Sequence, residues 1–299
     1  MEQEIIDTII TRPILRYPGS KWRLASWIHS FIPECHDTYN EPFVGTASVL
    51  LRKPRSRMEN INDASGDLIN FLITLRTHEA ELIRAIERTY WTPAELEIAM
   101  AVTDEPIEWA RRFYVRCWAN FHPFDSNPSF RRQMKISRQN GRDAMTPASK
   151  QFMRTDHLYH AAARLRGVCI EQMDAIKFIG MYDYDKAIFY IDPPYPFGTR
   201  VRANHYAIDE MSDSHHEALS DVLMGIDGMA IVSGYACDLY ADLYEAKGWA
   251  RVDKQTRTNG RDRLESLWIS PSTWQALESE RLERERQALP LFADQPFPF

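Results

Sequence analysis

The fold class follows from one stretch of the chain, Lys186-Ala187-Ile188-Phe189-Tyr190-Ile191-Asp192-Pro193-Pro194-Tyr195. Residues 187–191 are five consecutive apolar or aromatic residues between a polar segment, 182–186, and two prolines. A short apolar run with such borders is typical of a strand buried on both faces, as in a parallel sheet. Open α/β sheets bind their ligands at the carboxyl ends of these strands. The sequence therefore predicts an α/β fold with a ligand site at residues 192–195.

The loop after this run suits the chemistry of an aromatic amine. An exocyclic amine conjugated to a heteroaromatic ring is a poor nucleophile, because its lone pair is delocalised into the ring. The Asp192 carboxylate and the Pro193 carbonyl can accept its two N–H bonds, which favours tetrahedral nitrogen and frees the lone pair. The ring of Tyr195 offers a face on which a base can stack. An ordinary turn also favours Asp and Pro, so the loop alone leaves both interpretations open.

The composition is that of a globular protein. A chain of 299 residues allows one large domain or two smaller ones, and 44% hydrophobic residues suffice for a substantial core. No segment approaches the ~20 apolar residues of a membrane span, and residues 1–4 are acidic where a secretory signal would be basic. We therefore expect a cytoplasmic protein. The four cysteines form no Cys-x-x-Cys pair, so we expect free thiols and no metal site.

The charges are unevenly distributed along the chain. A formal net charge of -6 argues against a surface coated with positive charge for non-specific nucleic-acid binding. Residues 111–166, however, contain twelve Lys and Arg against three Asp. The middle of the chain is therefore basic and its flanks are acidic.

The amino-terminal part contains a second candidate ligand site. Residues 38–43 predict a short strand that runs into Val44-Gly45-Thr46-Ala47-Ser48 and then a helix. A glycine in a strand-to-helix turn lets the backbone approach a ligand closely. Asp63 follows the next strand, at a distance suited to bind the hydroxyls of an adenosine ribose. It can also cap the helix after it, and the two roles are compatible.

A loop near the amino terminus, Tyr17-Pro18-Gly19-Ser20-Lys21, precedes an amphipathic segment at residues 22–31. The end of this loop is similar to the end of a phosphate-binding loop. The first glycine of that motif is missing and no strongly apolar strand comes before it, so we reject a nucleoside triphosphatase. An ordinary loop with a surface lysine is the plain alternative.

The basic middle of the chain interrupts the alternation of strands and helices. Residues 78–120 show helical patterns, and residues 121–150 are irregular and basic. We therefore expect an inserted module at about residues 76–154. Its Arg, Lys, Gln and Asn side chains are the types that contact phosphates and base edges, although a solvated charged loop is an alternative. The leading candidates for DNA contact are Arg131, Arg132, Lys135 and Arg138.

The pattern of an α/β sheet resumes after this module. Strands are predicted at residues 168–171, 187–191 and 229–233, and Asp174 comes shortly after the first of them. Residues 249–256 and 265–270 predict an antiparallel pair. His215 and His216 have no partner motif, and we expect both on the surface of a helix.

These motifs occur in an order that resembles the Dam-type (D12 class) DNA adenine-N6 methyltransferases, over about residues 14–270. The resemblance implies a Rossmann-like class I methyltransferase fold with a seven-stranded, mostly parallel sheet. It implies a discontinuous catalytic domain at 1–75 and 155–275, a mainly helical target-recognition domain at 76–154, and a carboxyl-terminal helix and tail at 276–299.

The resemblance also assigns site residues. The family pattern is similar to Glu-Pro-Phe-x-Gly-x-Gly-Ser, and Ala47 stands where a second glycine is usual, which leaves the local backbone conformation open. Residues at positions matching the S-adenosylmethionine site are Tyr17, Lys21, Pro42, Phe43, Gly45, Asp63, Asp174 and Asp192. The catalytic residues implied are Asp192, Pro193, Pro194 and Tyr195.

The implied activity is transfer of a methyl group from S-adenosylmethionine to N6 of an adenine flipped out of double-stranded DNA. N4-cytosine methylation uses the same chemistry and is a second interpretation. A catalytically inactive DNA-binding relative is a third, but it predicts damage to Asp192 or to the glycine turn, and both are intact.

The carboxyl-terminal tail combines apolar residues with prolines. Gln287, Leu289, Leu291 and Phe292 resemble the short peptides with which bacterial DNA enzymes bind the replication sliding clamp. Docking on the catalytic domain is the interpretation that we favour, with clamp binding and disorder as alternatives.

Overall fold

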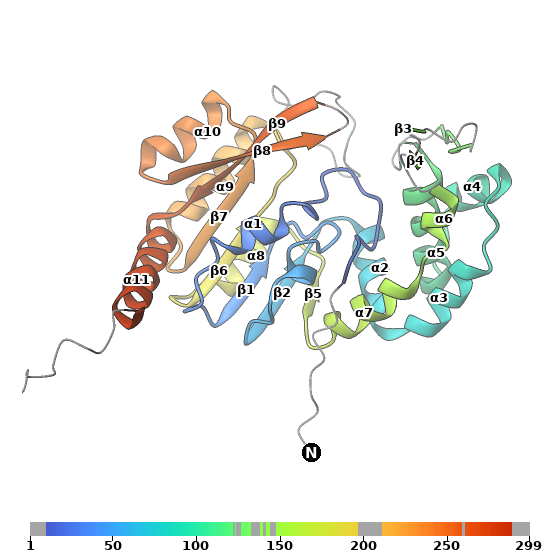
Figure 1. Ribbon diagram of the computed structural model, residues 1–299, viewed down its shortest axis with the longest axis horizontal. Coiled ribbons are helices and arrows are strands. Elements are labelled where there is room, and N and C mark those ends of the chain that lie inside the picture. The colour runs from blue at the N-terminus through green and yellow to red at the C-terminus, as the bar shows by residue number, and fades with distance from the viewer. Residues whose placement is uncertain are drawn as a thin grey trace, which may run out of the picture.

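The computed structural model describes residues 10–121, 123, 127–132, 138–139, 142–143, 148–196, 211–258 and 261–288. Within these residues the chain forms one seven-stranded sheet flanked by helices (Figure 1). The strands follow the order β5 (Cys169–Glu171), β2 (Met58–Asn62), β1 (Thr38–Glu41), β6 (Ala187–Ile191), β7 (Met229–Gly234), β9 (Arg261–Ile269) and β8 (Ala250–Thr258). A separate two-stranded sheet pairs β3 (Arg138–Gln139) with β4 (Arg142–Asp143).

The large sheet is mixed. Strands β5, β2, β1, β6 and β7 are parallel, whereas β9 is antiparallel to both β7 and β8. The expectation of seven strands is confirmed, but the sheet is mixed rather than mostly parallel, because β9 runs antiparallel to both of its neighbours, β7 and β8. The pair itself was predicted from residues 249–256 and 265–270.

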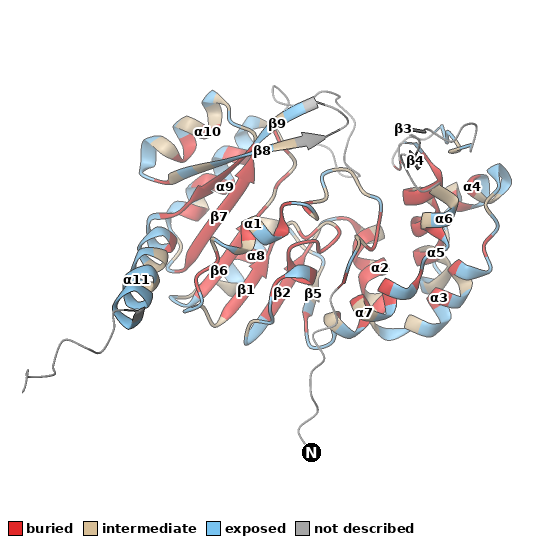
Figure 2. Ribbon diagram, viewed as in Figure 1, coloured by how far each residue is buried: buried red, intermediate tan, exposed pale blue. Residues whose placement is uncertain are grey.

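The strand at 187–191 lies in the middle of the sheet and is buried along its whole length, as predicted (Figure 2). Successive side chains of a strand point to opposite faces. Accordingly Ile188 and Tyr190 belong to one hydrophobic cluster, and Ala187, Phe189 and Ile191 belong to a second. The two clusters cover opposite faces of the sheet, which explains why this strand contains no alternation of polar and apolar residues.

The helices fall into two groups. Helices α2 (Gly66–Thr77), α3 (Glu79–Glu87), α4 (Pro93–Met100), α5 (Pro106–Ala119), α6 (Ala148–Phe152) and α7 (Asp156–Leu165) gather beyond the β5 end of the sheet (Figure 1). Around the sheet lie α1 (Ala25–His29), α8 (Ala175–Tyr182), α9 (Asp213–Met224), α10 (Asp238–Leu243) and α11 (Pro271–Ala288), with short 3-10 helices at Leu50–Arg52 and Glu245–Lys247. None of the helices in the described ranges is long and apolar enough to cross a membrane.

The helical group is held together by aromatic packing. Helix α5 contacts α2, α3, α4 and α6, and its Phe113, Tyr114 and Trp118 are buried. Tyr114 stacks on Phe71 of α2 and contacts Phe152 of α6. These aromatic side chains therefore form a core rather than an exposed binding platform.

Candidate active site

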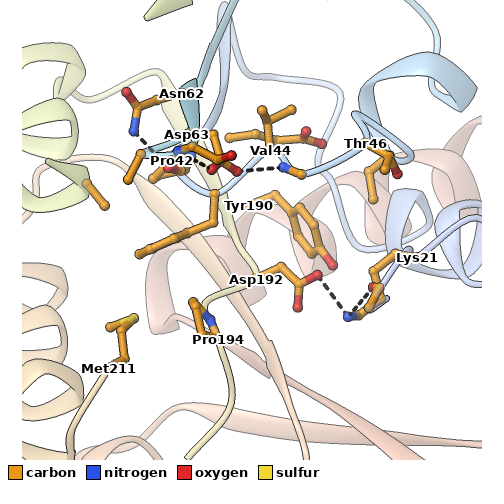
Figure 3. A pocket seen from close by; sticks show the side chains of 18 of the residues that line it. Lys21, Pro42, Val44, Thr46, Asn62, Asp63, Tyr190, Asp192, Pro194 and Met211 are labelled. Carbon is orange, nitrogen blue, oxygen red and sulfur yellow. Dashed lines mark hydrogen bonds and ion pairs between the residues drawn. The ribbon is translucent and has the colours of Figure 1, made fainter. Parts of the chain in front are cut away.

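A cavity of about 300 Å³ opens at the carboxyl ends of the central parallel strands (Figure 3). In the sheet, β2 is the neighbour of β1 on one side and β6 is its neighbour on the other side. The order of the strands therefore reverses between β1 and β6. Ligands of open α/β sheets bind at such a reversal of strand order. The cavity is lined by residues that follow four strands, β1, β2, β5 and β6, and by the loop 17–21.

Asp192 directs its carboxylate into this cavity. Oδ2 lies 2.8 Å from the Lys21 Nζ, and the pair is joined by a dashed line in Figure 3. In the part of the chain that the structure describes, Oδ1 is buried and has no hydrogen-bond partner. A buried acceptor without a donor costs about 1–3 kcal/mol, so such an atom calls for an explanation. An N–H group of a bound ligand would supply the missing donor.

Lys21 contacts both ends of the loop 192–195. Its side chain is buried, its Nζ donates a hydrogen bond of 3.1 Å to the Gly19 carbonyl, and the same nitrogen lies 4.8 Å above the centre of the Tyr195 ring. The sequence placed Lys21 with the cofactor residues. In the structure it lines the cavity and also contacts Asp192.

The turn after β1 has a left-handed backbone. Gly45 has a φ of +50°, and Ala47, which stands in place of the second glycine, has a φ of 53°. Alanine in this region costs about 1–2 kcal/mol, since its Cβ approaches the following carbonyl. The conformation that was left open at Ala47 is therefore the one that a glycine would adopt. Gly45 lines the cavity.

Asp63 fixes this turn to the end of β2. Its Oδ2 accepts a hydrogen bond of 2.9 Å from the Gly45 N–H, and its Oδ1 accepts one of 2.9 Å from the Ser65 N–H. Burial raises the pKa of Asp63, and the two N–H bonds oppose this shift. Ser65 is the residue that precedes α2, so Asp63 supports the start of that helix as well as lining the cavity.

Asp174 and Asn62 complete this side of the cavity. Asp174 is the N-cap of α8, where it accepts a hydrogen bond of 3.0 Å from the Lys177 N–H. The Asn62 side chain donates to the carbonyls of Pro42 and Met173, both at 3.0 Å, and so joins the ends of three neighbouring strands. Sequence reasoning missed Asn62, although its position directly before Asp63 was a signal.

Glu41 was also missed. It is a buried carboxyl at the end of β1 that lines the cavity. Its Oε1 accepts hydrogen bonds from the Tyr39 hydroxyl and, at 3.1 Å, from the Leu50 N–H. Burial raises the pKa of Glu41 to about 8, against the opposing effects of the Tyr39 bond and Lys53. Glu41 therefore ties the far end of the glycine turn back to the strand.

The remaining loop residues lie at different depths. Four of them line the cavity, namely Tyr17, Pro42, Phe43 and Pro194, and Pro193 is buried. Tyr195 is buried, and its ring packs edge-on against Tyr235 with centroids 4.7 Å apart. The use of its ring as a stacking surface for a base stays a prediction.

The candidate DNA contacts are only partly described. Arg131 donates to the Asn120 carbonyl at 2.8 Å and to the Phe121 carbonyl at 3.0 Å, so its guanidinium also holds the chain that follows α5. Arg132 is exposed. Lys135, the Arg138 side chain and the tail residues 289–299 lie outside the described residues.

The helix at residues 213–224 corrects one expectation. His215 bonds to Ser212 at the start of α9, but His216 is fully buried, with its Nδ1 3.2 Å from the Tyr240 hydroxyl. The prediction that both histidines are surface residues is wrong for His216, because α9 turns that side chain toward α10.

Comparison with known proteins places the chain in a family. No curated protein matched the sequence. A family model described as D12 class N6 adenine-specific DNA methyltransferase matches residues 17–258, which include the glycine turn, Asp63, Asp174 and residues 192–195. The protein therefore belongs to the D12 class of N6 adenine-specific DNA methyltransferases, as the order of its motifs indicated.

Proposed function

We propose that this protein transfers the methyl group of S-adenosylmethionine to the N6 amine of an adenine in double-stranded DNA. The observation that carries the proposal is the buried Asp192 Oδ1, which lacks a donor within the described residues and lies in the same cavity as Gly45 and Asp63. One cavity can therefore receive both an amine and a methyl donor.

The residues around the cavity fit the proposed cofactor. Gly45 leaves room for the methionine part, because a Cβ added there would meet no atom within 4 Å. Each Asp63 oxygen accepts one backbone N–H and has a second lone pair for a ribose hydroxyl. Asp174 lines the same side and can accept the adenine amine of the cofactor. When bound, the cofactor supplies a sulfonium methyl that is already electrophilic.

The protein's own residues then orient the target amine. Asp192 Oδ1 accepts one N–H and the Pro193 carbonyl accepts the other, which directs the nitrogen lone pair toward the methyl donor. Lys21 holds Oδ2, so the carboxylate is fixed before the base arrives. Alignment provides most of the acceleration, and no strong general base is required, since the proton can leave after transfer.

The target base must leave the duplex to reach this cavity. Flipping a base costs a few kcal/mol of lost stacking and pairing. Stacking on the Tyr195 ring would offset part of this cost, and the Lys21 side chain would have to yield space above that ring.

The helical group is proposed to recognise the target sequence. We keep the division into a catalytic domain at 1–75 and 155–275 and a recognition domain at 76–154. In its support, α5 packs on α3, α4 and α6, which lie in the same range, and it also packs on α2, which joins this range to the catalytic domain. Arg132, Arg131, Lys135 and Arg138 are the proposed phosphate contacts.

A triple variant in which Arg131, Arg132 and Lys135 are all replaced with Gln is expected to bind DNA more weakly, and its binding should depend less on salt concentration. Each lost phosphate contact reduces the slope of log K against log salt by about 0.9. Fluorescence anisotropy at several salt concentrations measures this slope. Arg131 also donates to two backbone carbonyls, so its replacement can disturb the local structure. The double variant Arg132→Gln/Lys135→Gln keeps Arg131 and should already show a reduced salt slope.

The control for this series is Arg57→Gln, an exposed arginine at the start of the sheet that pairs only loosely, at 3.7 Å, with Asp37. Its salt slope should equal that of the wild type. A triple variant with an unchanged slope would remove these residues from the DNA-contacting surface.

Label transfer tests the proposed function. Tritium from the methyl group of S-adenosylmethionine should appear in double-stranded DNA and not in RNA of the same sequence. Failure to label any double-stranded DNA from a diverse sequence library would refute the proposal.

A further inference from the structure

Glu265 lies next to the catalytic loop, although it is outside the segment matched by the family model. Strand β9 pairs with β7 as far as Ser266, which faces Gly234 at the end of β7. Glu265 precedes Ser266 in β9 and, because the two strands are antiparallel, it lies just beyond the carboxyl end of β7. Since β6 is the parallel neighbour of β7, this position is at the same edge of the sheet as residues 192–195.

The Glu265 carboxylate holds the hydroxyl of Tyr195. It is 8% exposed, and its Oε2 accepts a hydrogen bond of 3.2 Å from Tyr195. Ser233 Oγ lies 3.5 Å from the same hydroxyl. Tyr235 packs its ring against the Tyr195 ring, and its own hydroxyl accepts a hydrogen bond of 2.7 Å from Arg263. Residues at the carboxyl end of β7 and in the adjoining part of β9 thus surround the phenol of Tyr195.

The charges of Lys21 and Asp192 both act on the same carboxylate. Burial raises the pKa of Glu265, the positive charge of Lys21 lowers it, and the negative charge of Asp192 raises it. Lys21 is in ion-pair contact with Asp192 and lies above the ring whose hydroxyl Glu265 binds. The order of contacts is Glu265, Tyr195, Lys21 and Asp192.

We propose that Glu265 is a positioning residue for methyl transfer, which acts through the Tyr195 hydroxyl. With its hydroxyl bound, the Tyr195 ring cannot shift, and the ring in turn supports Lys21, which fixes Asp192. Glu265 itself touches neither the base nor the cofactor. This inference rests on the proposed function, because the reaction provides its readout.

The test compares Glu265→Leu, Glu265→Gln, Tyr195→Phe and the double variant Glu265→Leu/Tyr195→Phe in single-turnover methylation at saturating cofactor and DNA. Loss of the anchor should slow Glu265→Leu by about 10- to 100-fold, as small misplacements of reacting groups do. Glu265→Gln keeps an acceptor oxygen, so its rate should fall by less than about threefold. The cofactor Kd should stay within about twofold in all variants, since Glu265 does not line the cavity.

The double variant separates positioning from a merely structural role. If Glu265 acts through the hydroxyl, the double variant should be no slower than the slower single variant. Glu171→Gln is the matched control, because Glu171 also accepts a hydrogen bond from a tyrosine hydroxyl, that of Tyr182, at 3.1 Å. Glu171 belongs to β5, which lies four strands away from β7 in the sheet order. The transfer rate of this variant should equal that of the wild type.

Two results would overturn the inference: a Glu265→Leu rate within twofold of the wild type, or effects that multiply in the double variant. If Glu265→Leu does not fold, Glu265→Asp withdraws the carboxylate by one methylene and should show the same coupling with Tyr195→Phe. A wild-type protein that transfers no methyl group would refute the proposed function instead, before the variants are compared.

Discussion

Replacing Asp192 with alanine is expected to abolish methyl transfer, with a loss of at least about 10²–10³-fold, as found when one essential polar partner of a reacting group is removed. The carboxylate is proposed to accept the amine through Oδ1, and it has no proposed contact with DNA phosphates. DNA binding should therefore survive. Asp192→Asn should keep a small residual rate, because its amide oxygen can still accept one N–H.

Single-turnover transfer, cofactor calorimetry and DNA anisotropy on the same preparations measure the three quantities. Asp185→Ala is the control, since Asp185 is exposed and lies just before the amino end of β6. It should behave as the wild type in all three assays. A loss of DNA affinity as large as the loss of rate would contradict the assigned role of Asp192.

The largest effect on stability is expected at Glu59. Its side chain is 3% exposed and accepts hydrogen bonds from Lys53 at 2.7 Å and from Arg164 at 2.5 and 2.7 Å. Glu59→Ala would leave the two closest cations, Lys53 and Arg164, without this partner, and a third, Arg55, at 3.8 Å, would lose it as well. Removing one partner of a buried ion pair costs about 3–5 kcal/mol, so the free energy of unfolding should fall by that amount.

Urea denaturation at neutral pH measures this loss, with Glu79→Ala as the control. Glu79 forms an exposed pair with Arg166 at 3.3 Å, and such pairs contribute at most about 1 kcal/mol. A loss below 1 kcal/mol for Glu59→Ala would show that the buried network does not stabilise the fold.

The pH dependence of this effect has a definite sign. Burial alone would raise the pKa of Glu59, but Arg164 and Lys53 outweigh it and lower the pKa. A carboxylate with a lowered pKa stabilises the folded state above its unfolded pKa of about 4.3, and this contribution is lost as the pH falls further. The difference in stability between wild type and Glu59→Ala should therefore shrink below about pH 4. A difference that grows on acidification would contradict it.

Local patterns were sufficient to predict the main elements of the fold. The apolar run 187–191 is a buried central strand, and the helical patterns at residues 78–120 correspond to helices α3, α4 and α5. Parallel strands end at one edge of a sheet, so Gly45, Asp63, Asp174 and Asp192 could be expected to meet, and all four line one cavity.

Contacts between distant segments could not be predicted in the same way. Lys21 and Asp192 lie far apart in the sequence, and nothing local to either residue indicates their ion pair. Glu41 ends the strand Thr38–Glu41, whose sequence contains no apolar aliphatic residue. Its complete burial depends on the segments that pack around it, including the neighbouring strands β2 and β6. Glu265 becomes a neighbour of Tyr195 only through the antiparallel register of β9.

Analysis of the methylated nucleoside tests the central claim most directly. DNA labelled by the wild-type protein is digested to nucleosides, and the products are separated by chromatography with mass detection. Membership of the D12 class, together with the proposed role of Asp192, predicts N6-methyldeoxyadenosine as the only labelled nucleoside. Label in N4-methyldeoxycytidine, or in a carbon-methylated base, would contradict the assignment of adenine as the target.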